Sequence, residues 1–151
     1  MQEIKRSKRV GKGGFTLVEL IAVIGIAGIL LAIILLGAKG ARQASEISAT
    51  SRQVQTIYSA CQAWLGDGRV NYSGISMSAL TSANLLPTTL DNSWGGTYTV
   101  AAGTNEGQVI ITATAIPDQS TYNEIQSSLG AILAVNPGTY TGSSGTGTFT
   151  F

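Results

Sequence analysis

Histidine is absent from this chain of 151 residues, and cysteine occurs once, as Cys61. The lack of histidine excludes a Ser-His-Asp triad, a Cys-His pair and any zinc or haem site that uses histidine ligands. A single cysteine excludes an internal disulfide and a cysteine cluster, and it leaves the redox compartment undecided. These absences remove several classes of enzyme before any motif is considered.

Charged residues are also scarce, at 11% of the chain, and they are unevenly placed. Five basic residues and one acidic residue give the first fourteen positions a charge of +4, so the rest carries −3 against a total of +1. A basic leader on a weakly acidic body is typical of a membrane topology signal. Nucleic-acid binding would need a basic patch on the body itself, so we expect no direct contact with nucleic acid.

The five acidic residues after position 66 form no recognisable site. They are Asp67, Asp91, Glu106, Asp118 and Glu124. All lie in expected loops or near helix starts, where turn-forming and capping roles are the default. None of them forms an EF-hand loop, and Gly95-Gly96 lacks P-loop spacing. We therefore expect no catalytic residue, no metal site and no cofactor.

One long apolar run dominates the N-terminal part. Residues 20–38 are nineteen uncharged residues, and the run extends over residues 15–38 if Glu19 is admitted. As a helix it is roughly 30 to 36 Å long, enough to cross the hydrocarbon core of a bilayer. It is longer than the core of an ordinary secretory signal, and the best cut after it, Leu36-Gly37-Ala38, has a large residue where a small one is preferred. The basic leader predicts a single pass with the N-terminus in the cytoplasm.

Glu19 is the one charged residue inside this run. An acid near the start of an apolar membrane helix costs on the order of 2 to 3 kcal/mol unless it finds a partner. Glu19 is therefore a candidate functional residue. The alternative is that it lies among the lipid headgroups at little cost.

The segment Lys12-Gly13-Gly14-Phe15-Thr16-Leu17-Val18-Glu19-Leu20 resembles the class III signal of type IV pilins and pseudopilins. The shared features are Gly14 directly before the expected cleavage site, Phe15 directly after it, and Glu19 as the fifth residue of the expected mature chain. The resemblance implies that a membrane-embedded prepilin peptidase cuts between Gly14 and Phe15 and methylates the new amine of Phe15. It also implies that Glu19 pairs with the Phe15 amine of a neighbouring subunit and sets the axial register. The match covers about residues 9–40.

The implied chemistry is physically consistent. A glycine before the cut lets the backbone lie extended in a protease cleft. A carboxylate and an amine about 4 Å apart attract by on the order of 4 kcal/mol at an effective dielectric constant near 20, which offsets much of the burial cost. The peptidase activity belongs to the partner, and this chain is expected not to be an enzyme.

The apolar run is expected to continue as one helix of about fifty residues. No proline lies between Phe15 and Pro87, and Gly66-Asp67-Gly68 is the first expected break. After Ala38, apolar residues recur every three, four or seven positions along one face. That face holds Ile47, Val54, Ile57, Cys61 and Trp64, with Tyr58 and Leu65 beside them. The place of Cys61 on it favours a buried side chain over a reactive thiol.

The remainder is expected to form a small head. Ser76 is expected to cap a short helix that runs through Leu85 and stops before Pro87. Residues 97–101 and 109–115 are expected to pair as an antiparallel hairpin. A second helix is expected to begin at Pro117-Asp118 and to end near Gly130.

The last residues are expected to form a terminal strand. Thr146, Thr148 and Thr150 alternate with Gly147, Phe149 and Phe151, which gives the strand an aromatic inner face. Many pilins close this region with a disulfide loop, which a chain with one cysteine cannot form. Pairing of the strand with the sheet would take the place of that disulfide.

The expected fold is therefore α+β, in the arrangement of type IV pilins. A long N-terminal helix, half membrane and half amphipathic, packs on a small antiparallel sheet. Four segments are expected: a cleaved basic leader (1–14), a transmembrane and assembly helix (15–38), an amphipathic helix half (39–66) and a globular head with a C-terminal strand (67–151).

The resemblance implies a structural pilin, processed by prepilin peptidase and polymerised through its N-terminal helix. Its implied partners are the peptidase, the inner-membrane assembly machinery, the membrane before assembly and further copies of itself in an extracellular filament. A pseudopilin of a type II secretion system shares the whole N-terminus, and a membrane-anchored binding domain is a third hypothesis. The subtype, IVa or IVb, stays open, as does a role in adhesion, movement or DNA uptake.

Overall fold

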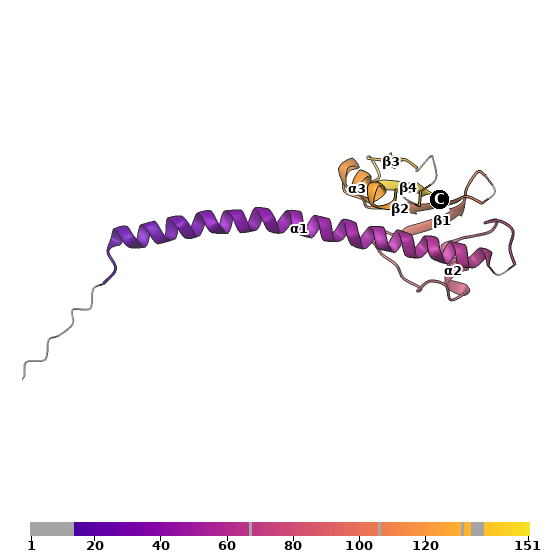
Figure 1. The fold of residues 1–151 in the computed structure, drawn as a ribbon, viewed down its shortest axis with the longest axis horizontal. Helices are drawn as coiled ribbons and strands as arrows, with labels where there is room; N and C mark the ends of the chain where they lie inside the picture. The colour runs from indigo at the N-terminus through magenta and orange to yellow at the C-terminus, as the bar shows by residue number, and fades with distance from the viewer. Residues whose placement is uncertain (1–13, 67, 106, 131, 134–137) are drawn as a thin grey trace, which may run out of the picture. The chain divides into compact units, whose positions relative to one another are not determined.

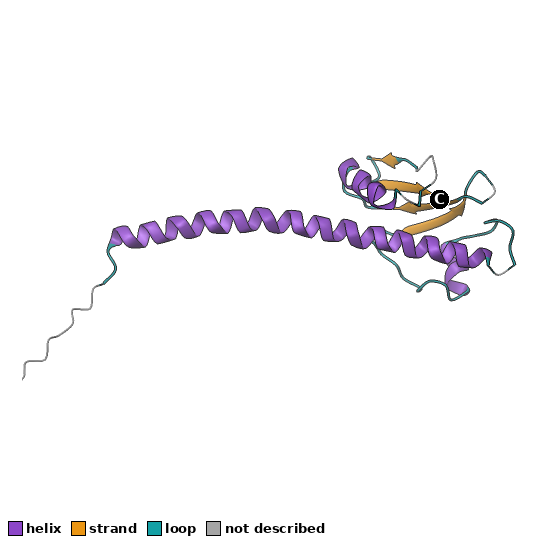
Figure 2. Cartoon of the chain, in the orientation of Figure 1, coloured by secondary structure: helices purple, strands orange, loops and turns teal. Residues whose placement is uncertain are grey.

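The computed structural model describes residues 14–66, 68–105, 107–130, 132–133 and 138–151, so most of the expected leader lies outside the described residues. The elements in chain order are α1 (Leu17–Leu65), α2 (Met77–Ser82), β1 (Tyr98–Ala102), β2 (Val109–Ala113), α3 (Gln119–Leu129), β3 (Tyr140–Thr141) and β4 (Thr146–Thr150) (Figures 1 and 2). The expected α+β class and the long N-terminal helix, which has 49 residues, are confirmed. The chain divides into two units, Met1–Gly40 and Ala41–Phe151.

The first unit contains the apolar part of α1. Every side chain from residue 14 to residue 40 is exposed, including those of the large aliphatic residues between Leu20 and Leu36. Among the described residues, α1 is the one helix that is long and apolar enough to cross a membrane. Such a surface is stable only in an apolar environment, because each Å² of apolar area left in water costs roughly 25 cal/mol.

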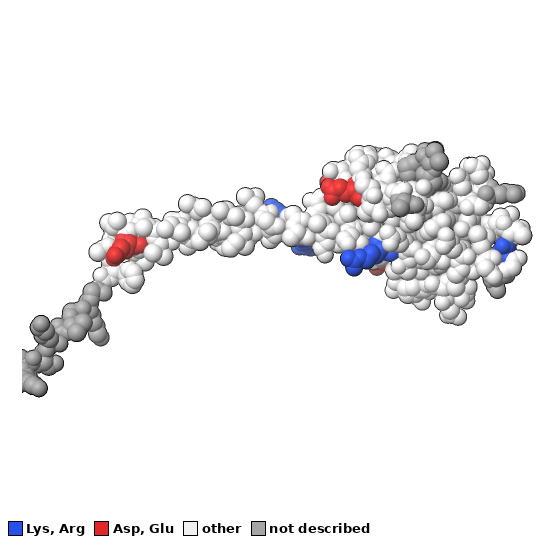
Figure 3. Space-filling view, in the orientation of Figure 1, with Lys and Arg blue, Asp and Glu red and all other residues white. Residues whose placement is uncertain are grey.

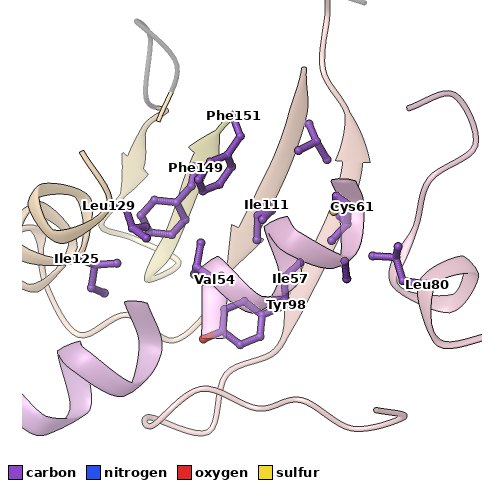
Figure 4. Packing of buried hydrophobic residues seen from close by; sticks show 14 of the residues in the cluster. Val54, Ile57, Cys61, Leu80, Tyr98, Ile111, Ile125, Leu129, Phe149 and Phe151 are labelled. Carbon is purple, nitrogen blue, oxygen red and sulfur yellow. The ribbon is translucent and has the colours of Figure 1, made fainter. Parts of the chain in front are cut away.

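The second unit is the head, and its core forms on one face of α1. Val54, Ile57 and Cys61 have no exposed surface, as the sequence periodicity predicted. Figure 4 shows them among the side chains of Ile111 and Phe149 from the sheet. Trp64, Tyr58 and Leu65 are partly buried at the margin of the same cluster.

Two polar residues of this α1 face, Thr50 and Ser51, are also buried, which the apolar periodicity did not predict. The Ser51 hydroxyl donates to the Ile47 carbonyl at 2.9 Å and lies 2.6 Å from the hydroxyl of Ser128 in α3. The bond back to the preceding helical turn lets a serine enter the core at little cost. It also places a polar contact between α1 and α3.

The four strands form one antiparallel sheet in the order β1-β2-β4-β3. Val109, Ile111 and Ala113 alternate inward along β2, and their neighbours in the strand point outward. The expected hairpin is confirmed with shifted bounds. β2 ends at Ala113 because Ala115 has a positive φ of 58°, which interrupts the ladder.

The C-terminal strand lies inside the sheet, between β2 and β3. Phe149 is completely buried, so the expected aromatic inner face is confirmed. The backbone N–H and C=O of Phe151 both bond to Val109 at 3.0 Å, and its ring stacks on Tyr58 with a centroid distance of 4.4 Å. Strand pairing therefore fastens the C-terminus without a disulfide. The two-residue strand β3 was not expected from the sequence.

Helix α2 is shorter than expected. Ser76 caps it as predicted, accepting a bond from the Ala79 N–H at 3.1 Å. The helix ends at Ser82 instead of running through Leu85, because Asn84 adopts a left-handed φ of 55°. The Leu85 N–H bonds to the Leu80 carbonyl and the Asn84 N–H to the Thr81 carbonyl, a Schellman ending in which asparagine takes the usual place of glycine.

The segment before β1 is fixed by the buried side chain of Asn92. Its Oδ1 accepts from the N–H groups of Trp94 and Gly96 at 3.0 and 2.8 Å, and its Nδ2 donates to the Thr114 carbonyl at 2.6 Å. A Cβ on Gly96 would lie 2.0 Å from that carbonyl oxygen, so only glycine fits. Trp94 Nε1 then donates to Glu46 on α1 at 3.1 Å. Gly95-Gly96 is thus part of a structural loop.

The first prediction concerns the C-terminal fastening. Replacement Phe151→Ala removes a nearly buried ring from contact with Tyr58, so we expect the free energy of unfolding of the head to fall by about 3 kcal/mol. Urea unfolding followed by the fluorescence of Trp64 and Trp94 measures this. Thr150→Ala, on the outer face of the same strand, is the control and is expected to cost less than about 1 kcal/mol. Equal losses in both variants would contradict the fastening role.

The second prediction concerns Asp118, which caps α3. Its Oδ1 accepts from the Thr121 N–H at 2.7 Å, and the hydrogen bonds of this cap lower its pKa. A lowered folded-state pKa stabilises the head above the unfolded pKa of about 4, and this stability is lost as pH falls through the folded value. Asp118→Asn keeps the capping oxygen but removes the titration. We therefore expect the variant to lose less stability than the wild type between about pH 4 and pH 2. Urea unfolding at a series of pH values measures this. Free energies of unfolding that fall in parallel with pH in the two proteins would refute it.

Candidate functional site

Thr16 and Glu19 form a capping box at the start of α1. The Thr16 hydroxyl accepts from the Glu19 N–H at 3.3 Å. In return, Glu19 Oε2 accepts from the Thr16 N–H at 2.8 Å and from the Thr16 hydroxyl at 3.0 Å. Each side chain satisfies a backbone N–H that has no partner within the helix.

This geometry changes the interpretation of Glu19. Its carboxylate bonds within its own first turn, at the helix end where the backbone dipole favours negative charge. The capping role was missed in the sequence, although Thr16-Leu17-Val18-Glu19 has the T-x-x-E pattern that signals it. Only Oε2 is used: Oε1 accepts no hydrogen bond within the described residues. Glu19 therefore keeps one oxygen for a further donor.

Gly14 and Phe15 lie directly before this capping box, outside the helix, and both are exposed. Phe15 is 84% exposed. A Cβ added to Gly14 would meet no atom within 4 Å. The fold of this chain therefore does not require glycine at position 14, and a requirement for it would have to come from a partner that handles the extended backbone.

The described part of the head holds no comparable constellation. No group of three or more Cys, Asp or Glu side chains that could hold a metal occurs within the described ranges. Glu46 bonds to Arg42 at 2.9 Å and to Trp94, and Asp118 caps α3. Burial raises the pKa of Cys61 to about 12, so its thiol stays protonated near neutral pH. These acids and the thiol have structural roles.

The surface charge of the head is sparse. Figure 3 shows a visible face that is mostly uncharged, with acidic and basic side chains in small, separate patches. Binding to nucleic acid depends on cations that neutralise several phosphates together. The face in view carries no such continuous cluster.

Two families match the chain. The family described as PilS N terminal matches residues 44–149, which is more than half of the chain and nearly the whole head. The family described as Prokaryotic N-terminal methylation motif matches residues 9–35, which include Gly14, Phe15, the capping box and much of the apolar part of α1. Neither the curated proteins nor the solved structures gave a match. The chain therefore belongs to the PilS N-terminal family and is a type IV pilin-like protein.

Proposed function

We propose that this protein is a structural subunit of a type IV pilus, processed between Gly14 and Phe15 by a prepilin peptidase, methylated on the Phe15 amine and polymerised through α1. The observation that carries the proposal is that a capping box at Glu19 directly precedes an exposed apolar helix surface over residues 20–38. The matched families are structural and not enzymatic, and we extend this to a chain without catalytic activity of its own.

The apolar half of α1 needs a bilayer before assembly. With the basic leader in the cytoplasm, residues 15–38 span the inner membrane and the amphipathic half and the head, residues 39–151, lie outside. Cleavage after Gly14 removes the leader and leaves the helix as an anchor. In the filament, the same surface packs against the helices of neighbouring subunits, so burial of the apolar area drives assembly.

Glu19 has a separate role at each stage. In the membrane, its Oε2 caps its own helix through Thr16, which lowers the cost of an acid in an apolar environment. Cleavage creates a positive amine at Phe15. In the filament, Oε1 accepts from that amine on the neighbouring subunit, because a carboxylate has acceptor sites on both oxygens. The pair contributes attraction at one register only, so it selects the axial step between subunits.

The third prediction tests processing. In cells that contain the peptidase, the mature chain is expected to begin at Phe15 with one added methyl group, as measured by intact mass and N-terminal sequencing. Gly14→Val is expected to leave the leader uncut, because a branched side chain obstructs the extended backbone in the protease cleft. Gly25→Ala, a change at another glycine with open space around it, is the control. A wild-type chain that kept Met1 would contradict the proposal.

The fourth prediction separates capping from pairing. Glu19→Gln keeps an oxygen that can accept from Thr16 but removes the charge, so we expect normal insertion and cleavage with a filament yield reduced at least tenfold. Glu19→Leu is expected to insert better and to assemble equally poorly. The measurement is the ratio of sheared filament to membrane-held mature subunit, with electron microscopy of the sheared material to separate long pili from short pseudopili. Normal yield from Glu19→Gln would show that pairing of charges is not required.

A further inference from the structure

Two helix faces of the head point away from its core. On α1, exposed residues recur every three or four positions on the side opposite the buried face, and they are Arg52, Gln55, Thr56, Ser59 and Gln62. On α3, the corresponding exposed residues are Ser120, Asn123, Glu124 and Ser127. All of these side chains are polar. The head therefore presents two polar helix faces that its own core does not use.

Each face carries charge of one sign. Arg52 is the only charged residue between positions 47 and 65, and the charged residues between positions 117 and 130 are both acidic, Asp118 and Glu124. In Figure 3 an acidic patch lies over α3 at the upper margin of the head, and a basic patch lies along α1 at the lower margin. The two faces are therefore complementary in charge and lie on different sides of the head.

Neither charge is neutralised inside the subunit. Arg52 Nη2 donates to the Ser48 hydroxyl at 3.0 Å, one turn earlier in α1, and the rest of the guanidinium stays available for an acceptor. Within the described residues, Glu124 forms no hydrogen bond, and the ion pair that occurs there joins Arg42 to Glu46. A guanidinium and a carboxylate can form two parallel hydrogen bonds, which makes them a specific pair.

Short side chains surround both charges. One turn away from Arg52 lie Ser48 and Thr56, and one turn away from Glu124 lie Ser120 and Ser128. The distance between two packed helices depends on the side chains at the contact. Short neighbours allow the two faces to approach closely, and the longer arginine and glutamate then reach across to each other.

We propose that Glu124 of one copy binds Arg52 of a second copy, so that the outward face of α3 docks on the outward face of α1. This inference rests on the proposed pilus function, because it names a contact between heads that polymerisation brings together. Since the two faces lie on different sides of the head, one copy cannot offer both to the same neighbour. The contact is therefore head-to-tail, and repetition of such a contact builds an open helical filament.

The pair selects the arrangement of the heads and does not drive assembly. An exposed ion pair adds little affinity by itself, so burial of the apolar half of α1 remains the driving force. Opposite charges at a contact favour one register, and like charges brought together oppose the alternatives. Polymerisation repeats the pair at every subunit, which multiplies a small effect along the filament.

The fifth prediction is a charge exchange in the full-length chain, in cells that contain the peptidase and the assembly machinery. Arg52→Glu and Glu124→Arg each bring like charges together, so we expect the ratio of sheared filament to membrane-held mature subunit to fall at least about threefold. Arg52→Glu/Glu124→Arg restores opposite charges, and we expect a ratio within about twofold of the wild type. Arg52→Glu/Ser82→Arg is the matched control, because it has the same net charge but places the new base on exposed Ser82 of α2. Its ratio is expected to stay as low as that of Arg52→Glu.

Chemical cross-linking tests whether the contact is head-to-tail. Filaments of Arg52→Cys/Glu124→Cys are treated with a short bismaleimide, and the native thiol of Cys61 does not compete because it is completely buried. We expect a ladder of dimers, trimers and longer products. Either single-cysteine variant, and the double variant dispersed in detergent, is expected to give monomers.

The possible failures are distinguishable. A wild type that forms no filament would overturn the pilus proposal and this contact together. With filaments present, normal yield from both single reversals, no recovery in the exchange, or a ladder that stops at dimers would overturn the contact alone. Cross-linking of the two positions to a different protein, without links between copies, would assign these faces to another partner and would also overturn it.

Discussion

The structure depends on one face of α1, because the head has no core without it. Val54, Ile57 and Cys61 are completely buried and contact a cluster to which every strand except β3 contributes a buried side chain. Burial of each large aliphatic side chain is worth about 1.5 to 3 kcal/mol. The helix that is proposed to anchor and polymerise the subunit is therefore also the element on which the head folds, and it cannot be lost without losing the head.

With one cysteine, the chain cannot fix its C-terminal region by an internal disulfide, and the pairing of β4 fixes it instead. Its central place in the sheet gives β4 a bonded neighbour on each side, and Phe149 and Phe151 fill the core from the end of the chain. A strand at the edge would leave one row of backbone groups unpaired. The last residues thus close the fold through hydrogen bonds and aromatic contacts in the place of a covalent link.

The proposed roles of the N-terminal segment and of the head differ in the same way as their charge and apolar surface. The proposed processing and register chemistry lies within six residues, from Gly14 to Glu19, at the start of a helix that is apolar on all sides. Figure 3 shows few charged side chains on the visible face of the head.

Local features could be predicted from the sequence because each is decided within a few residues. The length of α1 follows from the lack of proline, and Ser76 and Asp118 cap helices three residues before the amides they bind. The alternation of Phe149 and Phe151 with threonines showed which side of β4 is buried. The Thr16-Glu19 capping box was equally local, and its pattern was present in the sequence.

The tertiary structure alone decided the order of the strands, the existence of β3, the burial of Thr50 and the pairing of Phe151 with Val109. These depend on contacts between residues far apart in the chain, and no short window of sequence contains both partners. Two-residue β3 is a strand only because β4 lies beside it. Composition and periodicity determine which side of an element is apolar, whereas the packing of all elements around α1 determines which apolar sides meet.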